Sequence, residues 1–340
     1  MNILVTGGCG FVGSSICTYL KKKNKNLNIL SVDNLSKIYS KYNQRNLKKN
    51  KINNKIINVG NIKKFQNLKF KADFIIDCSA EPSVEASRKN ISKVIESNFL
   101  STLNVLEKAK RDKSKVIFLS SSRVYPIKLS YNKFKKYVKT GKHNLYNEND
   151  NVLGIKTIYG FSKLSSEELI KEYMYSNKIE YIINRCGLIS GPGQFGKMEQ
   201  GLVSLWMWKH INKKKIYFIG YNGSGKQIRD VLFVEDLCDL ILKQIKNFKK
   251  FKNNLFCVGG GKKNAVDLKK LTYLCETISG NKIKVFKINK TSNYDIPYYV
   301  TSLKKILKIS NWKPNKNLKS GLEETYRWMV ENKTQIKNYF

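Results

Sequence analysis

The stretch NILVTGGCGFVG, residues 2–13, decides the fold of this 340-residue chain. Its first five residues form a short apolar run typical of a buried strand, and a helical pattern extends from the last glycine to Lys23. Between them, Gly7, Gly10 and Gly13 recur at intervals of three residues. Such a turn lets the backbone approach a pyrophosphate, while the N-terminus of the helix supplies N–H donors. An ordinary tight turn can contain the same glycines, so their surroundings decide between the two readings.

The second apolar run, residues 27–33, supplies the missing context because it ends at Asp33, 20 residues after Gly13. A carboxylate at this point hydrogen-bonds the ribose hydroxyls of the adenosine half of a dinucleotide and repels a 2′-phosphate. The two features together predict a dinucleotide site that favours NAD over NADP.

Short apolar runs alternate with helical patterns over the N-terminal half of the chain. Strands separated by helices indicate parallel βαβ units, and their succession predicts an α/β fold with a doubly wound parallel Rossmann sheet. The predicted strands are 2–6, 27–33, 55–60, 72–80, 115–122 and 179–187, and the predicted helices are 13–23, 94–111 and 160–176.

The C-terminal third is predicted to form a smaller mixed α/β lobe that binds substrate. Its predicted strands are 215–220, 254–260 and 283–288, with helices near 234–247, 267–279 and 318–332. We assign residues 1–185 plus 226–258 to an NAD-binding Rossmann domain and residues 186–225 plus 259–340 to the substrate-binding lobe. Residues 126–156 are rich in lysine and are expected to be a long loop that contacts substrate or closes over it.

Tyr159 and Lys163 carry the second chemical signal. Residues four apart share one face of a helix, so the ammonium lies beside the phenol and favours its ionised form. A tyrosine activated in this way is a credible general base, although most such pairs only form a solvated helix face. Three serines, residues 120–122, end the strand 115–122, and one of them can hydrogen-bond a reacting hydroxyl. With a cofactor that accepts hydride, the set favours catalysis over the solvated face.

The charge balance excludes other classes of protein. The formal net charge is +39, but the 64 basic residues comprise 57 lysines and seven arginines, spread along the whole chain. Arginine is the preferred residue for bidentate phosphate and base contacts, so we expect no nucleic-acid partner. No apolar run approaches the length of a membrane span, and we expect a cytoplasmic protein with no membrane partner. Two histidines and seven cysteines without a CxxC pair predict no metal site.

The motifs TGGCGFVG (6–13), SSSRVY (120–125) and YGFSK (159–163) together resemble the extended short-chain dehydrogenase/reductase family, whose members include NAD-dependent epimerases and dehydratases. Residues 191–206, 220–241 and 311–329 resemble the branch that epimerises CDP-linked hexoses at C2. The resemblance implies an enzyme of polysaccharide biosynthesis with NAD as cofactor, a nucleotide sugar, CDP-linked, as substrate, and a homodimer as the assembly.

The resemblance also implies roles for individual residues. The catalytic set is Ser121, Tyr159 and Lys163, with Ser120 and Ser122 as the alternative serines. The cofactor residues, besides Tyr159 and Lys163, are Gly7, Gly10, Phe11, Val12, Gly13, Asp33, Asn34, Asn61, Ile62, Ser79, Ala80, Glu81, Asn98, Arg185, Gly187 and Leu188. The substrate residues are Ser121, Ser122, Gln194, Phe195, Gln200, Gln227 and Arg229. Pro297 stands where the family places a second arginine for the substrate diphosphate.

The implied reaction is epimerisation, in which the sugar is oxidised to a keto intermediate and hydride is returned to its other face. Dehydration is disfavoured, because Ser122 and Arg123 occupy the positions of the acid pair that dehydratases use. A nucleotide-sugar dehydrogenase or reductase with dissociable NAD remains an alternative, as does a non-catalytic NAD-binding protein. The sugar, the nucleotide and the carbon that is epimerised stay open.

Overall fold

The computed structural model describes residues 1–83, 89–197 and 200–340. By their internal contacts these residues form two compact units. The first unit comprises residues 1–124, 157–185 and 238–256, and the second comprises 125–156, 186–237 and 257–340.

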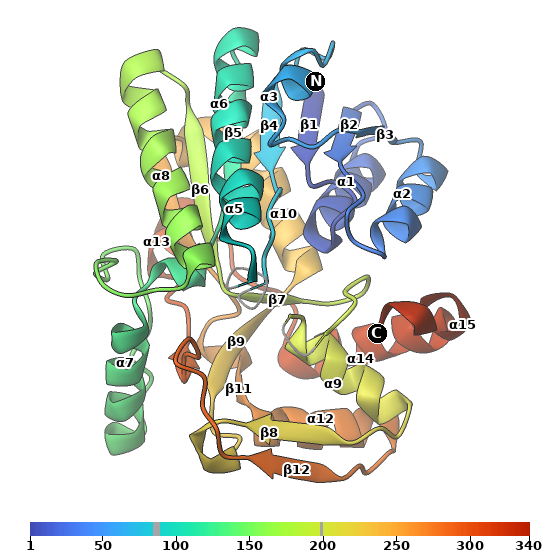
Figure 1. The fold of residues 1–340 in the computed structure, drawn as a ribbon, viewed down its shortest axis with the longest axis vertical. Coiled ribbons are helices and arrows are strands. Elements are labelled where there is room, and N and C mark those ends of the chain that lie inside the picture. Colours follow the sequence, from blue (N-terminus) through green and yellow to red (C-terminus); the bar gives the residue numbers. More distant parts are fainter. Residues whose placement is uncertain (84–88, 198–199) are drawn as a thin grey trace. The chain divides into compact units, whose positions relative to one another are not determined.

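A seven-stranded parallel sheet organises the first unit, and it confirms the predicted fold class (Figure 1). Its strand order is β10-β6-β5-β4-β1-β2-β3. The order reverses between β1 and β4, which is the point where doubly wound sheets bind ligands at the carboxyl ends of their strands. The strands are β1 (Asn2–Thr6), β2 (Asn28–Asp33), β3 (Asn53–Ile56), β4 (Phe74–Asp77), β5 (Lys115–Ser121), β6 (Tyr181–Cys186) and β10 (Asn254–Val258).

Helices bury this sheet, as the near-continuous apolar strands require. Ile3, Leu4 and Val5 of β1 are fully buried. Leu4 belongs to a core shared with helices α6 and α8, which lie side by side in Figure 1. The helices of this part of the chain are α1 (Phe11–Lys23), α2 (Ser40–Lys49), α3 (Ile62–Gln66), α5 (Ile91–Ile95), α6 (Ser101–Asp112), α8 (Ile158–Asn177), α10 (Val234–Lys246), which continues from the second unit, and α11 (Phe248–Phe251).

Two local predictions are wrong in part. The third strand spans Asn53–Ile56 rather than 55–60, because the register with β2 ends at the pair Asp33 and Ile56. The predicted helix 94–111 is interrupted by a π-helical turn, Glu96–Leu100, between α5 and α6. Such turns are frequent at functional sites, and no periodicity in the sequence announces them.

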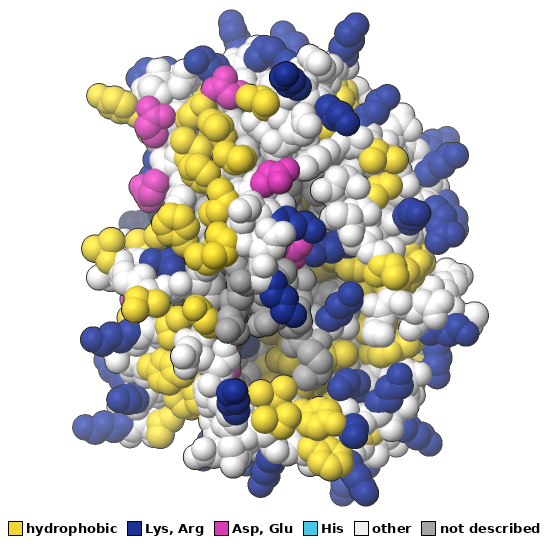
Figure 2. Space-filling view, in the orientation of Figure 1, with side chains coloured by type: hydrophobic (Ala, Val, Ile, Leu, Met, Phe, Trp, Pro, Cys, Tyr) yellow, Lys and Arg dark blue, Asp and Glu magenta, His cyan; other side chains and the backbone are white. Residues whose placement is uncertain are grey.

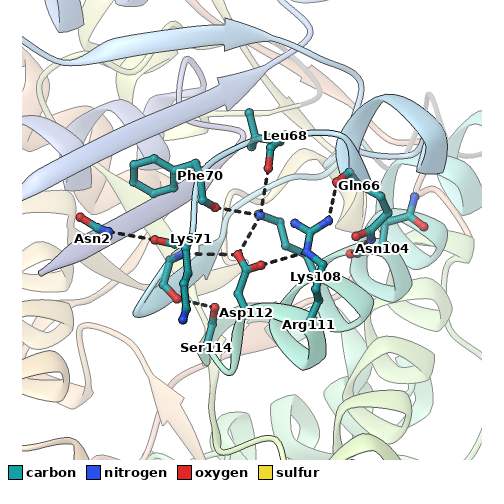
Figure 3. Close-up of polar contacts among 11 residues, drawn as sticks. Asn2, Gln66, Leu68, Phe70, Lys71, Asn104, Lys108, Arg111, Asp112 and Ser114 are labelled. Atoms are coloured by element: carbon teal, nitrogen blue, oxygen red, sulfur yellow. Dashed lines mark hydrogen bonds and ion pairs between the residues drawn. The ribbon is translucent and has the colours of Figure 1, made fainter.

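A buried lysine ties α6 to the segment before β4 (Figure 3). The Lys108 ammonium is fully buried and donates to the carbonyl of Phe70 at 2.9 Å and to Asp112 at 2.8 Å. Burial lowers the pKa of Lys108. Burial would raise the pKa of Asp112, but hydrogen bonds from Lys108 and Arg111 outweigh it and hold this pKa below its usual value. The carboxylate therefore stabilises the fold whenever it is ionised.

The first prediction follows from this cluster. Asp112→Asn is expected to lower the free energy of unfolding by about 3 kcal/mol near neutral pH, because it leaves a buried ammonium without its counter-ion. A depressed carboxyl pKa stabilises the protein above the unfolded-state pKa of about 4 and ceases to do so as the pH falls through the folded-state value. The deficit of the variant should therefore shrink in acid. Urea unfolding at several pH values measures it.

The control for this measurement is Glu168→Gln, since Glu168 forms a solvent-exposed pair with Lys171 at 2.7 Å. Exposed pairs contribute about 0–1 kcal/mol. Equal losses in the two variants would contradict the stabilising role of the Lys108 cluster.

The second unit contains two smaller sheets. In the first, β11 (Ala265–Asp267), β9 (Ile228–Phe233) and β13 (Tyr298–Tyr299) lie in that order, and β7 (Leu188–Ser190) also pairs with β9. In the second, β8 (Ile216–Ile219) pairs in parallel with β12 (Val285–Ile288). The helices of this unit, besides the first turn of α10, are α7 (Ile127–Thr140), α9 (Leu202–Ile211), α12 (Leu268–Ser279), α13 (Lys304–Ser310), α14 (Leu318–Glu331) and α15 (Lys333–Ile336).

The unit boundaries differ from the sequence-based domain ranges at three places, the smallest being residues 257–258, which lie in the second unit. Residues 226–237 lie in the second unit, because β9 pairs with β7, β11 and β13 instead of joining the large sheet. Residues 125–156 also lie there, and they contain helix α7 where a loop was expected. Ser130 of α7 donates to the carbonyl of Tyr298 at 2.7 Å, which fastens this helix to β13.

On the face of the molecule that Figure 2 shows, basic side chains are spread out and not gathered in one patch. Lysine and arginine side chains lie scattered over the visible face in Figure 2, with few acidic side chains among them. Among the described residues, no helix has both the length and the apolar character that crossing a membrane requires.

Candidate active site

The glycine turn after β1, called here the glycine cradle, packs too closely against neighbouring backbone to accept side chains. Gly7 has a φ of +61°, and a Cβ there would lie 2.8 Å from the carbonyl oxygen of Cys78. A Cβ on Gly13 would overlap the carbonyl oxygen of Gly7. Helix α1 begins at Phe11 directly after this turn, so the N–H groups of its first turn, which have no acceptor within the helix, lie beside the glycines. The cradle fits the pyrophosphate of a dinucleotide.

Asp33, at the carboxyl end of β2, is held beside the cradle. Its carboxylate accepts hydrogen bonds from the backbone N–H of Cys9 at 3.0 Å and of Leu35 at 2.7 Å. The side chain is buried, and burial raises the pKa of Asp33 against the lowering effect of these hydrogen bonds. The carboxylate is thus fixed in place, with lone pairs left for ribose hydroxyls.

The second prediction concerns cofactor choice. Asp33→Ala is expected to narrow the preference for NAD over NADP, because the variant removes the charge that repels a 2′-phosphate. Calorimetric titration with both dinucleotides measures the two affinities. Asp73→Ala, at the amino end of β4, is the matched control. An unchanged ratio in Asp33→Ala, or tighter NADP binding by the native protein, would contradict the role given to Asp33.

Residues 79–81 leave β4 next to Asn98, which lies in the π-helical turn. Asn98 is fully buried, accepts from the Glu81 N–H at 2.7 Å and donates to Ser162 of α8 at 3.0 Å. The Glu81 carboxylate pairs with Lys37 at 2.6 Å. Asn98 therefore connects the segment after β4 with α8, and the π-helical turn gives it this position.

The other cofactor candidates are spread over the structure. Asn34, Asn61 and Ile62 are solvent-exposed, and Asn61 caps α3 by accepting from the Lys64 N–H. Gly187 and Leu188 belong to the second unit, where the Gly187 N–H donates to the Val258 carbonyl at 2.8 Å. None of these contacts assigns or removes a role in NAD binding.

The proposed catalytic residues lie where α8 begins against the end of β5. A Cβ on Gly160 would overlap the carbonyl oxygen of Arg123, so this glycine lets the first turn of α8 touch the turn Ser122–Val124. Tyr159 is partly buried, whereas Lys163 is almost fully buried, with its ammonium 4.4 Å from the centre of the Phe118 ring. The contact brings the YGFSK and SSSRVY motifs together.

The three serines have different surroundings. Ser120 donates to the buried carboxylate of Glu167. The Ser121 hydroxyl accepts from the Arg123 N–H at 3.2 Å, and Ser122 begins the turn that follows. Neighbouring residues of a strand point to opposite faces, so Ser120 and Ser121 have different surroundings although they are adjacent in the chain. The Ser120 hydroxyl is buried and donates its hydrogen to Glu167.

Two of the residues expected to bind substrate, Gln194 and Phe195, make contacts with other residues of the second unit. The Gln194 amide oxygen accepts from Ser190 at 3.0 Å and from Ser204 at 2.6 Å, and its nitrogen donates to the Ile189 carbonyl at 2.9 Å. Phe195 is buried among Trp328, Tyr339 and Phe340. Gln200 is exposed.

Gln227 and Arg229 flank the start of β9. The Gln227 nitrogen donates to the Ile219 carbonyl at 2.7 Å, and its oxygen is buried without a hydrogen-bond partner among the described residues. Arg229 donates to the Ile296 carbonyl and lies 3.6 Å from Asp295. Its guanidinium is therefore already engaged by the segment that precedes Pro297.

Two residues at this site escaped the sequence reasoning. Glu167 pairs with Arg185, for which only a cofactor role was expected. Gly160 lies inside the YGFSK motif, and nothing in the motif marks it as a point of close contact. A signal in the sequence could have found Glu167, because it follows Lys163 by four residues and so lies on the same helix face as Tyr159 and Lys163.

The fold and this arrangement define an NAD-dependent enzyme of the short-chain dehydrogenase/reductase type, and residues 3–259 match the NAD dependent epimerase/dehydratase family. The chain belongs to this family. Its relatives include the CDP-paratose 2-epimerase of Salmonella typhi, 27% identical over 96% of this chain and 99% of the relative. The UDP-glucuronate 4-epimerase of Thermodesulfobacterium geofontis is 27% identical over 98% of each chain.

A solved structure shares the fold. The UDP-glucose 4-epimerase of Thermotoga maritima, determined with UDP-glucose, superposes with a TM-score of 0.84 at 22% identity, covering 98% of this chain and 99% of that one. The match to the family model confirms the family resemblance and the NAD cofactor expected from the motifs. One of the three proteins named is a 2-epimerase of a CDP-linked sugar and two are 4-epimerases of UDP-linked sugars, so the family leaves the substrate of this chain open.

Proposed function

We propose that this enzyme epimerises a nucleotide-linked sugar at C2, with a CDP-linked hexose as substrate. The observation that carries the proposal is the contact between the start of α8 and the end of β5, which brings together the segments bearing Tyr159, Lys163 and Ser121. The choice of CDP and of C2 rests on the resemblance of residues 191–206 and 220–241 and on the Salmonella typhi relative. Cytoplasmic location and a homodimer belong to the same proposal.

The glycine cradle and Asp33 would hold NAD, which would supply a reversible hydride acceptor. Tyr159 removes the proton from the sugar hydroxyl as the carbon is oxidised. Ser121 donates a hydrogen bond to the reacting oxygen, and Lys163 keeps the phenolate charged. After the keto sugar presents its other face, Tyr159 returns the proton to the sugar oxygen as the bound cofactor would give back its hydride. No net oxidation results.

Ser121 is the preferred serine because Ser120 is bound to Glu167 and Ser122 lies beyond the strand. For the substrate diphosphate, Arg229 supplies the guanidinium fork that matches phosphate oxygens. Its present hydrogen bond to the Ile296 carbonyl would be exchanged for one to phosphate. Pro297 occupies the place of the second arginine of the family pattern, so Arg229 is the one arginine of that pattern left to bind the substrate diphosphate.

Hydrogen retention tests the reaction. The enzyme is incubated in deuterated water, without added NAD, with hexoses linked to CDP, UDP or dTDP, and the Tyr159→Phe variant is the control. We expect the CDP-linked hexose to be epimerised at C2 while the hydrogen on that carbon is retained.

Each other outcome overturns part of the proposal. Solvent deuterium at the epimerised carbon would indicate proton abstraction from carbon. Net accumulation of NADH would indicate the alternative, a nucleotide-sugar dehydrogenase with dissociable NAD. Turnover of only a UDP- or dTDP-linked sugar would contradict the choice of CDP as the nucleotide. Epimerisation at another carbon would contradict the choice of C2.

A further inference from the structure

Helix α8 carries an acidic residue on the face that bears the proposed catalytic pair. Tyr159, Lys163 and Glu167 follow each other at intervals of four residues, so their side chains form one stripe along the helix. Glu167 is fully buried. A carboxylate without solvent is stable only if it is paired, so its partners define what it does.

Both partners of Glu167 come from strands of the large sheet. Arg185 on β6 grips the carboxylate with two nitrogens: Nε lies 3.0 Å from Oε1, and Nη2 lies 2.7 Å from Oε2. Ser120 on β5 donates to Oε1. The Arg185 side chain is also buried. The carboxylate thus joins three elements, α8, β5 and β6, by charge-assisted hydrogen bonds of fixed geometry.

These elements carry the proposed catalytic residues. Ser120 directly precedes Ser121, so fixing the Ser120 hydroxyl also fixes the backbone that presents Ser121. Lys163 lies one turn of α8 before Glu167, packed over Phe118 of β5 at 4.4 Å. The ion pair therefore sets the register between the serine and the tyrosine–lysine pair.

We propose that Glu167 and Arg185, with Ser120, are positioning residues of the active site, which align Ser121 with Tyr159 and Lys163 and keep the buried charge beneath Lys163 balanced. The proposal rests on the proposed function of Tyr159 as acid and base. None of the three residues need touch substrate.

Charge balance gives the proposal a signature of its own. Glu167→Gln leaves the Arg185 charge uncompensated, which favours the phenolate of Tyr159. Arg185→Gln leaves the Glu167 charge uncompensated, which disfavours the phenolate. The elements packed against α8 carry further charged residues, among them Arg123 on the turn after β5, Glu107 of α6, and Glu81 and Glu96, which bind Lys37 and Asn58. These are unchanged in both variants, so the two effects must be opposite in sign.

The experiment measures kcat against pH, and NAD affinity by calorimetry, for the holoenzyme and its Glu167→Gln, Arg185→Gln and double Gln variants. We expect the acid limb of the kcat profile to move by on the order of one pH unit, down in Glu167→Gln and up in Arg185→Gln. The double variant should return near the native midpoint with a kcat still reduced about tenfold. NAD affinity should change little in Glu167→Gln, because Glu167 is not among the proposed cofactor residues.

Ser120→Ala keeps the ion pair between Glu167 and Arg185 and removes only the hydrogen bond that links it to β5. This variant therefore tests the proposal even if the Gln variants fail to fold. We expect about a tenfold lower kcat with an unshifted acid limb. A loss as severe as that of Ser121→Ala would instead identify Ser120 as the catalytic serine. Native kcat in Ser120→Ala, or folded Gln variants with unshifted profiles, would overturn the positioning role.

A second readout separates this proposal from the proposed function. The phenol of Tyr159 can be titrated by NMR of isotope-labelled tyrosine, assigned by the signal lost in Tyr159→Phe, without any substrate. Opposite shifts in the two Gln variants would support the positioning pair even if no nucleotide sugar were turned over. Absence of these shifts in an enzyme that epimerises normally would overturn the pair alone.

Discussion

Tyr159→Phe is expected to lower kcat by about 10²–10⁴-fold, because the substitution removes only the hydroxyl that transfers the proton. NAD affinity should stay near its native value, since the glycine cradle and Asp33 are untouched and the phenol acts in the transition state. Single-turnover kinetics with the nucleotide sugar, and calorimetry with NAD, measure the two quantities separately.

Tyr175→Phe is the matched control for this variant. Tyr175 lies on the same helix but is 77% exposed, so the same chemical change there should leave kcat unaltered. Native activity in Tyr159→Phe would remove Tyr159 from the mechanism. An equal loss of NAD affinity and of kcat would show that the phenol of Tyr159 binds the cofactor and does not transfer the proton.

Gly160→Ala is expected to lower kcat by about 10²-fold, although it adds a single methyl group and changes no proposed catalytic residue. The new Cβ would overlap the Arg123 carbonyl oxygen, so the first turn of α8 must move away from the end of β5. A misplacement of about 1 Å between reacting groups costs about 10²-fold in rate. NAD should still bind, because β1, α1 and Asp33 do not move.

Ser165→Ala, further along α8, tests whether substitution by alanine in this helix is itself harmful, and it should be active. Circular dichroism verifies that both variants are folded. A folded Gly160→Ala variant with native kcat would show that close contact between α8 and the serine turn is not required.

The features that depend on residues close together in the chain could be predicted from the sequence. The glycines of 7–13, the carboxylate that ends β2 and the alternation of strands and helices belong to short segments whose periodicity reflects the finished structure. The family motifs are equally short. Fold class, family and cofactor therefore follow from the order of residues along the chain, and all three are confirmed. The roles of individual site residues stay predictions.

Pairings between distant segments could not be derived in this way. Nothing within residues 226–237 tells that β9 pairs with β7, β11 and β13, because an apolar strand pattern does not name its partners. The π-helical turn that buries Asn98 and the helix at 127–140 were missed for a related reason, since both depend on what packs against them.

By itself, the sequence determined that the chain forms a doubly wound sheet with an NAD cradle, because those features depend on residues close together along the chain. Only the tertiary structure decided that Ser120 donates to the buried carboxylate of Glu167. It also decided that Arg185 belongs with Glu167, and that Gly160 must lack a side chain. In each case the deciding contact joins residues at least 18 positions apart, and a chain folds such residues together only through packing that no local pattern encodes.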